Sequence, residues 1–389
     1  MKNFLDNNAF CILPWTHLCV RPDEKIKPCC RYQITEDVID INLDKIKAQG
    51  IEAMNTPYLK NLRQDMLAGK QRPECRKCYL QEKNKKFFKN RRSLRIRSNE
   101  DFAKFLKDSY SENFDQIRYI EMSIDNICNL QCRMCDSKFS SKLQARDKFL
   151  NDTVHKKLEP TFNKFDNLDL SGLVYIKLLG GEPFISPNFL KFLEYIEERS
   201  NPNKIHLEIA TNGTSIPNES ILKKLNRYKM LEINVSLDTY DKSNDYQRVG
   251  ADHTQVFKNA KIYKSLFNCE NNIAIHSTIS LYTANHLSKT LDFLINKKGY
   301  DTSVDFVMFP KYLSLQCAPQ SYKDWVLEKN KENSKATRYI NTFIKQGKYD
   351  KEQWEMFLST TKKLDKFYNT DIKDFNPELV EYLENNYGF

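Results

Sequence analysis

Three cysteines stand close together in the segment Cys128-Asn129-Leu130-Gln131-Cys132-Arg133-Met134-Cys135. Thiolates are the usual ligands of iron–sulfur clusters, and one short loop with gaps of three and two residues can hold three corners of a four-iron cubane. The fourth iron would have no ligand from the protein and could bind a substrate. A zinc knuckle that lacks one ligand, or three buried thiols, would fit the same spacing.

The residues around this segment alternate between strand and helix patterns. We predict strands at 117–124, 174–179, 205–210, 230–237, 272–279 and 304–309, and helices between them at 140–149, 188–198, 219–228, 254–266 and 285–295. Six strands that alternate with helices indicate parallel βαβ units with right-handed crossovers, which build an open or closed α/β barrel. The chemistry of such barrels lies at the carboxyl ends of the strands, and the cysteine segment follows the first strand.

This combination resembles the radical S-adenosylmethionine (SAM) superfamily, whose signature is Cys-x-x-x-Cys-x-x-Cys after the first strand. The resemblance implies a partial (β/α)6 TIM-like barrel in which Cys128, Cys132 and Cys135 hold a 4Fe–4S cluster. It implies that SAM binds the open iron through its amino and carboxylate groups. One electron from the cluster then cleaves SAM, and the 5′-deoxyadenosyl radical that forms abstracts a hydrogen atom.

Other residues match positions that bind SAM in this family. The run Gly180-Gly181-Glu182-Pro183 ends the second predicted strand. It resembles the family segment that hydrogen-bonds the amino group of the cofactor with its backbone carbonyls and its acid, here Glu182. Two glycines allow the backbone to approach a ligand closely. Met134 occupies the family position beside the adenine ring. An ordinary turn between a strand and a helix would also explain the run at 180–183.

The ends of the third and fourth predicted strands carry further matches. Asn212 lies in a Thr-Asn-Gly segment that many relatives share at this place. In similar enzymes, polar residues at the positions of Ser236 and Asp238 reach the ribose, and the arginine at the position of Arg248 binds the cofactor carboxylate. A bidentate pair of arginine and carboxylate is a sound physical basis for that contact. An acid and an arginine near strand ends can also be structural.

A second set of cysteines precedes the barrel. The segments Cys11-Ile-Leu-Pro-Trp15, Pro28-Cys29-Cys30 and Cys75-Arg-Lys-Cys78 resemble the twitch domain, half of a SPASM domain, in an unusual amino-terminal position. The resemblance implies an auxiliary 4Fe–4S cluster, with the ligands Cys11, Cys29, Cys75 and Cys78. Glu24 stands where the usual pattern has a glycine. Four thiolates would suit zinc equally well.

Two other cysteines of this region stand outside the predicted ligand set. We expect short strands at 16–20 and 25–29 around a turn, followed by helices at 44–54 and 57–67. Neighbouring side chains on a strand point to opposite faces, so Cys30 should face away from Cys29. No role is assigned to Cys19 or Cys30.

The chain divides into a twitch region with a basic linker at 1–100, the barrel at 101–319 and a helical tail at 320–389. Tail helices are predicted at 322–331, 335–345, 351–367 and 377–386. The run 83–97 interleaves basic and aromatic residues, as in segments that bind nucleic acids or peptides, although a solvated linker helix explains it equally simply. Cys317 is either a hydrogen-atom donor near the substrate or a buried structural thiol.

Composition limits the class of protein. The odd count of 11 cysteines and the absence of a signal sequence argue against a disulfide framework. We expect a cytoplasmic protein with no membrane contact. The net charge of +10 favours an anionic partner only weakly, and we do not expect a nucleic acid.

The resemblance favours a peptide as the substrate, because many twitch and SPASM relatives modify ribosomally made peptides. A flavodoxin or ferredoxin is the expected electron donor. A small molecule or nucleotide is the alternative substrate. A non-catalytic metal module that binds RNA is the alternative of another class.

Overall fold

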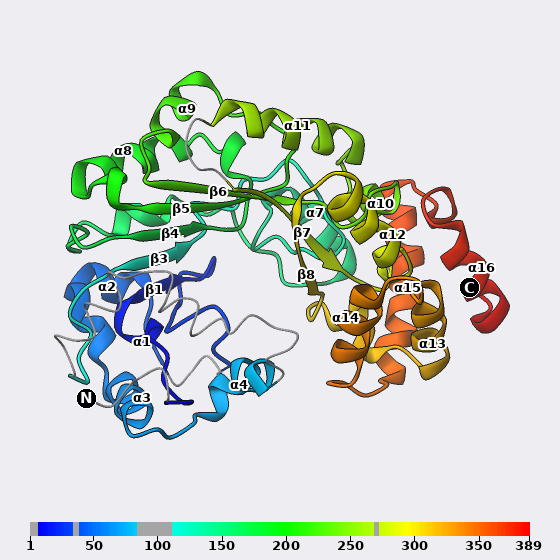
Figure 1. Cartoon of the computed structure of the whole chain (residues 1–389), viewed down its shortest axis with the longest axis horizontal. Coiled ribbons are helices and arrows are strands. Elements are labelled where there is room, and N and C mark those ends of the chain that lie inside the picture. The colour runs from blue at the N-terminus through cyan, green and yellow to red at the C-terminus, as the bar shows by residue number, and fades with distance from the viewer. Residues whose placement is uncertain (1–6, 34–38, 84–110, 268–271) are drawn as a thin grey trace.

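The computed structural model describes residues 7–33, 39–83, 111–267 and 272–389. Its centre is one eight-stranded sheet with the order β2-β1-β3-β4-β5-β6-β7-β8 (Figure 1). All neighbouring strands run parallel except β2, which is antiparallel to β1.

Six of these strands form the expected partial barrel, and the predicted α/β class is confirmed. They are β3 (Tyr119–Met122), β4 (Tyr175–Leu178), β5 (His206–Thr211), β6 (Met230–Ser236), β7 (Asn272–Ile279) and β8 (Asp301–Phe306). The crossover helices are α7 (Gln144–Leu150), α8 (Phe189–Arg199), α9 (Glu219–Leu225), α10 (Ser243–Gln247), α11 (His253–Leu266) and α12 (Leu287–Leu291), which continues as a π-helix (Asp292–Lys297). The predicted strands agree with these bounds to within three residues.

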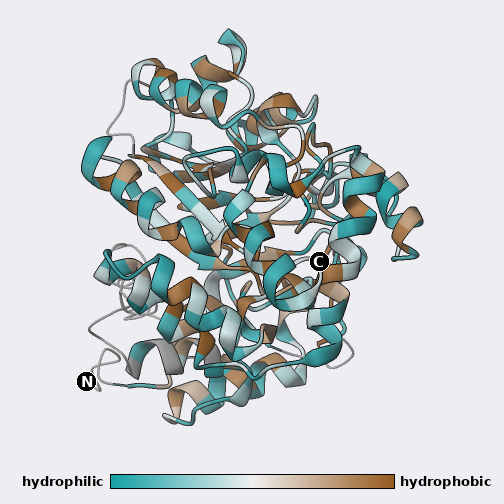
Figure 2. Ribbon diagram, turned by 90° about the vertical axis from the view of Figure 1, so that its right-hand side faces the viewer, coloured by the Kyte–Doolittle hydropathy of each residue, from teal (hydrophilic) through white to brown (hydrophobic). Residues whose placement is uncertain are grey.

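The two faces of the sheet differ in character. One face packs against the helices with fully buried side chains such as Ile176, Leu207 and Ile233. On the other face, Lys177 is paired with Glu208, which also accepts a hydrogen bond of 2.6 Å from the Tyr175 hydroxyl. Strand side chains alternate between faces, so polar and apolar residues alternate along the strands, as the hydropathy colouring shows (Figure 2).

The amino-terminal region joins this sheet. It contains α1 (Leu13–Thr16), β1 (His17–Val20), β2 (Ile26–Lys27), α2 (Leu43–Gln49), α3 (Pro57–Leu67) and α4 (Arg76–Lys83). β1 pairs in parallel with β3, so one sheet spans the twitch region and the barrel. The helix expected at 44–54 ends earlier as an α-helix, because Gly50 has a φ of +58° and a 3-10 helix (Gly50–Asn55) follows. The proposed boundary at residue 100 lies outside the described residues.

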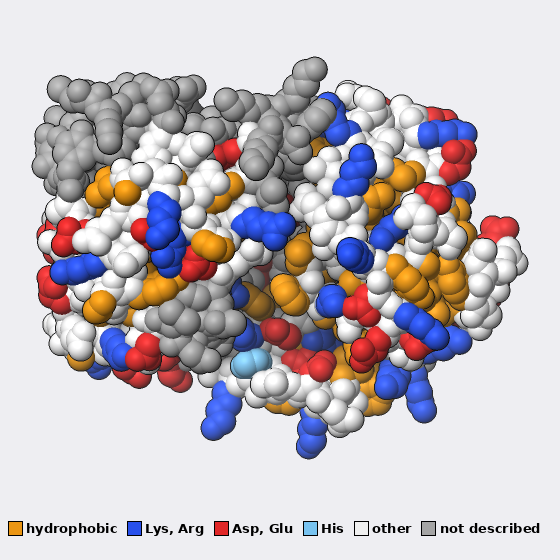
Figure 3. All heavy atoms as spheres, turned by 90° about the horizontal axis from the view of Figure 1, so that it is seen from below, with side chains coloured by type: hydrophobic (Ala, Val, Ile, Leu, Met, Phe, Trp, Pro, Cys, Tyr) orange, Lys and Arg blue, Asp and Glu red, His pale blue; other side chains and the backbone are white. Residues whose placement is uncertain are grey.

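The expected helical tail is confirmed. It consists of α13 (Gln320–Lys329), α14 (Ser334–Ile344), α15 (Lys351–Tyr368) and α16 (Pro377–Tyr387). Its core, with Tyr322 and Phe357 fully buried, continues into the residues that follow β7, such as Tyr282. None of the helices in the described part of the chain is long and apolar enough to cross a membrane. Seen from below, the molecule is hollowed near its middle, and acidic and basic side chains are both visible there (Figure 3).

Candidate active site and metal centres

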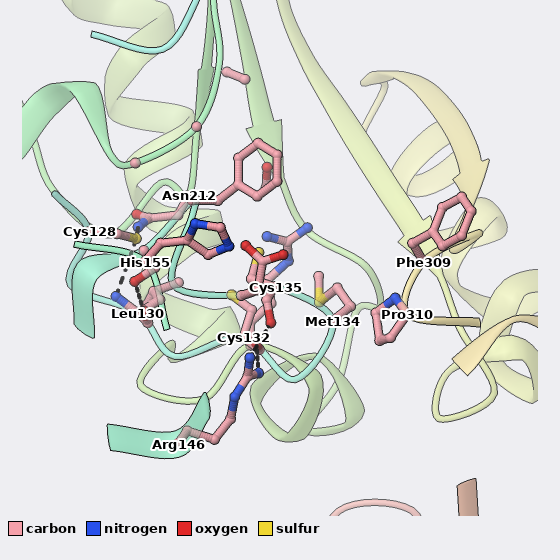
Figure 4. Close-up of a pocket in the computed structure, with 18 of the residues that line it drawn as sticks. Cys128, Leu130, Cys132, Met134, Cys135, Arg146, His155, Asn212, Phe309 and Pro310 are labelled. Atoms are coloured by element: carbon pink, nitrogen blue, oxygen red, sulfur yellow. Dashed lines mark hydrogen bonds between the residues drawn. The ribbon is translucent and has the colours of Figure 1, made fainter. Parts of the chain in front are cut away.

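The three cysteines of the first motif meet at one cavity of about 660 Å³ at the carboxyl ends of the barrel strands. In the close-up, Cys128 and Asn212 lie on one side, Phe309 and Pro310 lie on the opposite side, and Cys135 lies between them (Figure 4). The Asn212 amide nitrogen is 3.8 Å from the Cys128 sulfur. The spacing therefore brings all three thiols to the place where the barrel does its chemistry.

Contacts with two other segments hold the cysteine loop. The backbone amides of Gln131 and Arg133 donate to the carbonyls of Val249 and Gln247 at 2.9 and 2.8 Å. The Arg146 guanidinium donates to the carbonyls of Cys132 and Cys135 at 3.3 and 2.6 Å. These hydrogen bonds fix the backbone on both sides of the middle cysteine.

The chemistry of the thiols suits iron. Burial raises the pKa of Cys128 to about 11. A hydrogen bond between the other two thiols raises the pKa of Cys132 and lowers that of Cys135. Thiolates gathered here need compensating positive charge, which cluster irons supply. The donor set of the structure therefore fits the cluster that the sequence predicts.

Six of the nine expected cofactor residues line the same cavity. They are Met134, Gly180, Gly181, Asn212, Ser236 and Arg248. Gly180 and Gly181 have φ values of +66° and +59°. A Cβ atom at Gly180 would lie 2.3 Å from the Ser123 hydroxyl oxygen, and one at Gly181 would lie 2.8 Å from the Ile127 carbonyl oxygen. Glycine is required at both positions, and the backbone is exposed to the cavity as a result.

The other three residues, Glu182, Pro183 and Asp238, are buried behind the lining. The Glu182 carboxylate accepts hydrogen bonds from the Thr211 hydroxyl at 2.7 Å and from the Asn212 amide at 2.6 Å. It therefore joins the ends of β4 and β5. Burial raises the pKa of Glu182 to about 7.

Asp238 holds the arginine of the cavity. Its two carboxylate oxygens accept from Nε and one terminal nitrogen of Arg248, both at 2.8 Å, and from the Thr278 amide at 2.8 Å. The side chain of Asp238 is fully buried. The contact of Asp238 with the ribose stays a prediction, and in the structure its carboxylate orients Arg248.

Sequence reasoning missed several residues of the cavity. Arg146 comes from α7, and Phe309 follows β8 with 81% of its surface exposed. A position after the last barrel strand is a usable signal for Phe309, since sites gather at strand ends. Nothing in the spacing of the sequence distinguishes Arg146 from a surface arginine. Cys317 does not line the cavity, and its thiol donates to the Lys311 carbonyl at 3.2 Å.

The four cysteines predicted for the auxiliary site line a second, smaller cavity. They are Cys11, Cys29, Cys75 and Cys78. Burial raises the pKa of Cys75 to about 12, with Cys11 and Cys78 adding to it. Glu24, which stands in place of the usual glycine, has a φ of +64°, the left-handed conformation that glycine adopts most easily. Cys19 and Cys30 lie outside the cavity lining. Residues 84–97 of the basic run lie outside the described residues.

Comparison with known proteins identifies both regions. The family model of the radical SAM superfamily matches residues 122–294, and that of the SPASM iron-sulfur cluster-binding domain matches residues 11–79. A GTP 3′,8-cyclase of Lactiplantibacillus plantarum is 26% identical over 52% of this chain and 57% of its own length. One of Haemophilus ducreyi is 29% identical over 32% of this chain and 34% of its own. The match thus spans little more than half of the first of these relatives and about a third of the second.

The matches among solved structures have lower sequence identity. The anSMEcpe structure with bound AdoMet has a TM-score of 0.40 at 20% identity and covers 56% of this chain and 58% of its own. Streptococcus suis SuiB bound to S-adenosylmethionine has a TM-score of 0.35 at 19% identity and covers 67% of this chain and 51% of its own. The matched families use a radical SAM 4Fe–4S cluster, SAM and an auxiliary iron–sulfur cluster as cofactors. The chain belongs to the radical SAM superfamily and carries a SPASM iron–sulfur domain ahead of its barrel.

Proposed function

We propose that this radical SAM enzyme modifies a peptide by hydrogen abstraction. The observation that carries the proposal is the convergence of Cys128, Cys132 and Cys135 with six expected cofactor residues on one cavity. When bound, the cluster supplies the electron that cleaves SAM to the 5′-deoxyadenosyl radical. A non-catalytic RNA-binding module would have no need for a built cavity beside these three cysteines.

Each expected residue has a role in this proposal. The three cysteines of the loop hold the cluster, and the exposed backbone at Gly180 and Gly181 binds the amino group of SAM. Arg248 binds the carboxylate of SAM, oriented by Asp238. Met134 contacts the adenine and Ser236 contacts the ribose. Asn212 lies beside Cys128 on the side that faces the cofactor. Glu182 and Pro183 determine the shape of the turn.

The auxiliary site has its own ligands in the proposal. Cys11, Cys29, Cys75 and Cys78 hold a second 4Fe–4S cluster, since their thiols line one buried cavity. Zinc is the alternative occupant. A flavodoxin or ferredoxin supplies the electron, and we propose a cytoplasmic location.

The charges of the cavity favour a peptide over a nucleotide. Among the described residues, the arginines and lysines that line it are Arg146 and Arg248, and both are paired with buried acids, Asp147 and Asp238. A triphosphate is normally bound by several cationic groups. In this proposal Arg248 binds the carboxylate of SAM, and Arg146 is occupied by Asp147 and by the carbonyls of Cys132 and Cys135. The lining also carries carboxylates, which repel phosphate groups. The exposed ring of Phe309 offers an apolar contact for a peptide side chain.

The nucleotide alternative rests on the sequence relatives, which are GTP 3′,8-cyclases. A direct comparison separates the two. Reduced enzyme with SAM is given GTP in one reaction and, in another, synthetic peptides encoded beside its gene. Modified peptide mass and peptide-dependent 5′-deoxyadenosine are expected, with Cys132→Ala as the inactive control. If a product forms from GTP and no peptide is modified, the proposed substrate is a nucleotide and not a peptide.

A further inference from the structure

Two amino-terminal cysteines remain outside the auxiliary site, and one of them lies in a separate cluster of ligand-type side chains. His17 and Cys19 are two residues apart on β1, so both point to the same face of the sheet. Glu121 is the register partner of Cys19 on the neighbouring strand β3. Three different metal-binding groups therefore meet where the SPASM region joins the barrel.

The geometry of this cluster is close to that of a metal site. The ligand atoms of His17, Cys19 and Glu121 all lie within 4.8 Å of one another, and the imidazole Nε2 is 3.8 Å from a Glu121 oxygen. Zinc bond lengths of about 2.0–2.3 Å in a tetrahedral site place neighbouring ligand atoms about 3.3–3.8 Å apart. A contraction of about 1.5 Å at most would bring the three ligand atoms to these separations. The three residues are at most 2% exposed, so the site is built into the core.

A cation beside Glu121 would add to the positive charge that balances its carboxylate. In the described part of the chain, this carboxylate accepts a hydrogen bond from Tyr119 at 3.1 Å and lies 3.8 Å from the imidazole Nε2 of His17. Lys177, its register partner on β4, interacts with the charge of Glu121 but makes its ion pair with Glu208. A buried carboxylate that shares its lysine with a second acid is stabilised by further positive charge beside it.

The thiol points to the same conclusion. Burial raises the pKa of Cys19, and the charges of Glu121 and Cys30 raise it further. A thiolate would form here only next to a cation, and metal binding provides one.

We propose that His17, Cys19 and Glu121 bind one zinc ion. Imidazole, thiolate and carboxylate are all established zinc ligands. The ion joins β1 to β3 and so links the SPASM region to the barrel. This site is independent of the proposed function and of the occupant of the four-cysteine site.

Metal analysis of the holoprotein tests the proposal. Wild-type protein from zinc-supplemented cells, purified without oxygen, should contain one zinc per chain in addition to about eight iron and eight sulfide from two cubanes. Cys19→Ser and Glu121→Gln, which keep side-chain size, should each lose the zinc and retain the iron. Zinc-edge X-ray absorption of the wild type should show sulfur at about 2.3 Å.

Matched variants keep the test decisive. Cys317→Ser changes a buried thiol elsewhere and should retain both metals. Cys75→Ser should lose about four iron, the content of one cubane, and keep the zinc. Retained iron in Cys19→Ser and Glu121→Gln reports that these variants fold. The proposal is overturned if the wild type holds no zinc, if zinc persists in both variants, or if it is lost with Cys75→Ser instead.

Discussion

Arg248 reaches the cavity with its guanidinium already oriented by a buried acid. Burial alone would lower the pKa of Arg248, but Asp238 and the thiols of Cys132 and Cys135 raise it above its usual value. The arginine is therefore a permanent positive charge in a fixed direction. Such a group can bind the carboxylate of SAM without first being ordered.

We predict that Arg248→Ala weakens SAM binding about ten- to a hundredfold, because a charge-assisted hydrogen bond contributes about 1.5–3 kcal/mol. Asp238→Asn should weaken it less, since the guanidinium stays but loses its bidentate support. Equilibrium binding of SAM to the reconstituted protein measures both effects, and the visible spectrum of the cluster should remain unchanged. Equal affinity in the wild type and both variants would remove Arg248 from the cofactor site.

Glu182 predicts a pH dependence of stability. Its ordinary pKa is 4.5, and burial raises the pKa in the folded protein to about 7. Between these values the folded state binds more protons than the unfolded state, so stability falls as the pH rises from about 4.5 to 7. Glu182→Gln has no titrating carboxyl at this position. The pH-dependent change in its free energy of unfolding should therefore be smaller than that of the wild type, by about 3 kcal/mol at most. Thermal unfolding without SAM at pH 5 and pH 8 provides the measurement, and parallel profiles for the two proteins would contradict it.

At the scale of elements, α15 supports the cysteine loop from the other end of the chain. The buried guanidinium of Arg133 donates to Asp365 and Thr370, both at 2.8 Å, and lies 3.8 Å from the ring centre of Tyr246. The Tyr368 hydroxyl donates to the Gln131 carbonyl at 3.3 Å. The residue between two proposed cluster ligands is thus anchored to the carboxyl-terminal helices.

We predict that Asp365→Ala destabilises the protein by about 3 kcal/mol, because it leaves a buried arginine without its anion. The loop should then release iron faster to a chelator. Unfolding and iron-release measurements are compared with Asp374→Asn, which alters an exposed acid on the next short helix. Iron release at the wild-type rate in Asp365→Ala would show that α15 does not stabilise the loop.

At the scale of the whole molecule, the strands and helices were predictable from the sequence, because their residue patterns are periodic. The contacts between residues far apart in the chain were not predictable. Strands such as β7 follow from β-branched runs between helices. The pairing of β1 with β3 could not be predicted, because it joins a four-residue strand to one about a hundred residues away. The contact of Arg133 with Asp365 spans 232 positions and leaves no local pattern.

The candidate site shows the same division. One short loop carries Cys128, Cys132 and Cys135, so their spacing alone predicted that they meet, and they line one cavity. The four auxiliary cysteines come from separate segments; the family resemblance implied that set, and the four line a second cavity. The role of Asp238 depends on how two strand ends face each other, which spacing does not encode. The glycines at 180 and 181 were recognisable from the family resemblance, and their positive φ values and close neighbours explain why glycine stands there.

The central claim is that Cys128, Cys132 and Cys135 hold the cluster that cleaves SAM. The most direct test is the amount of 5′-deoxyadenosine formed from SAM by anaerobically reconstituted, reduced protein. We predict that the wild type forms 5′-deoxyadenosine and that Cys132→Ala forms none, because a cubane without one of its three thiolates is not stably held. Cys317→Ala should form as much as the wild type. Undiminished 5′-deoxyadenosine formation by Cys132→Ala would contradict the account.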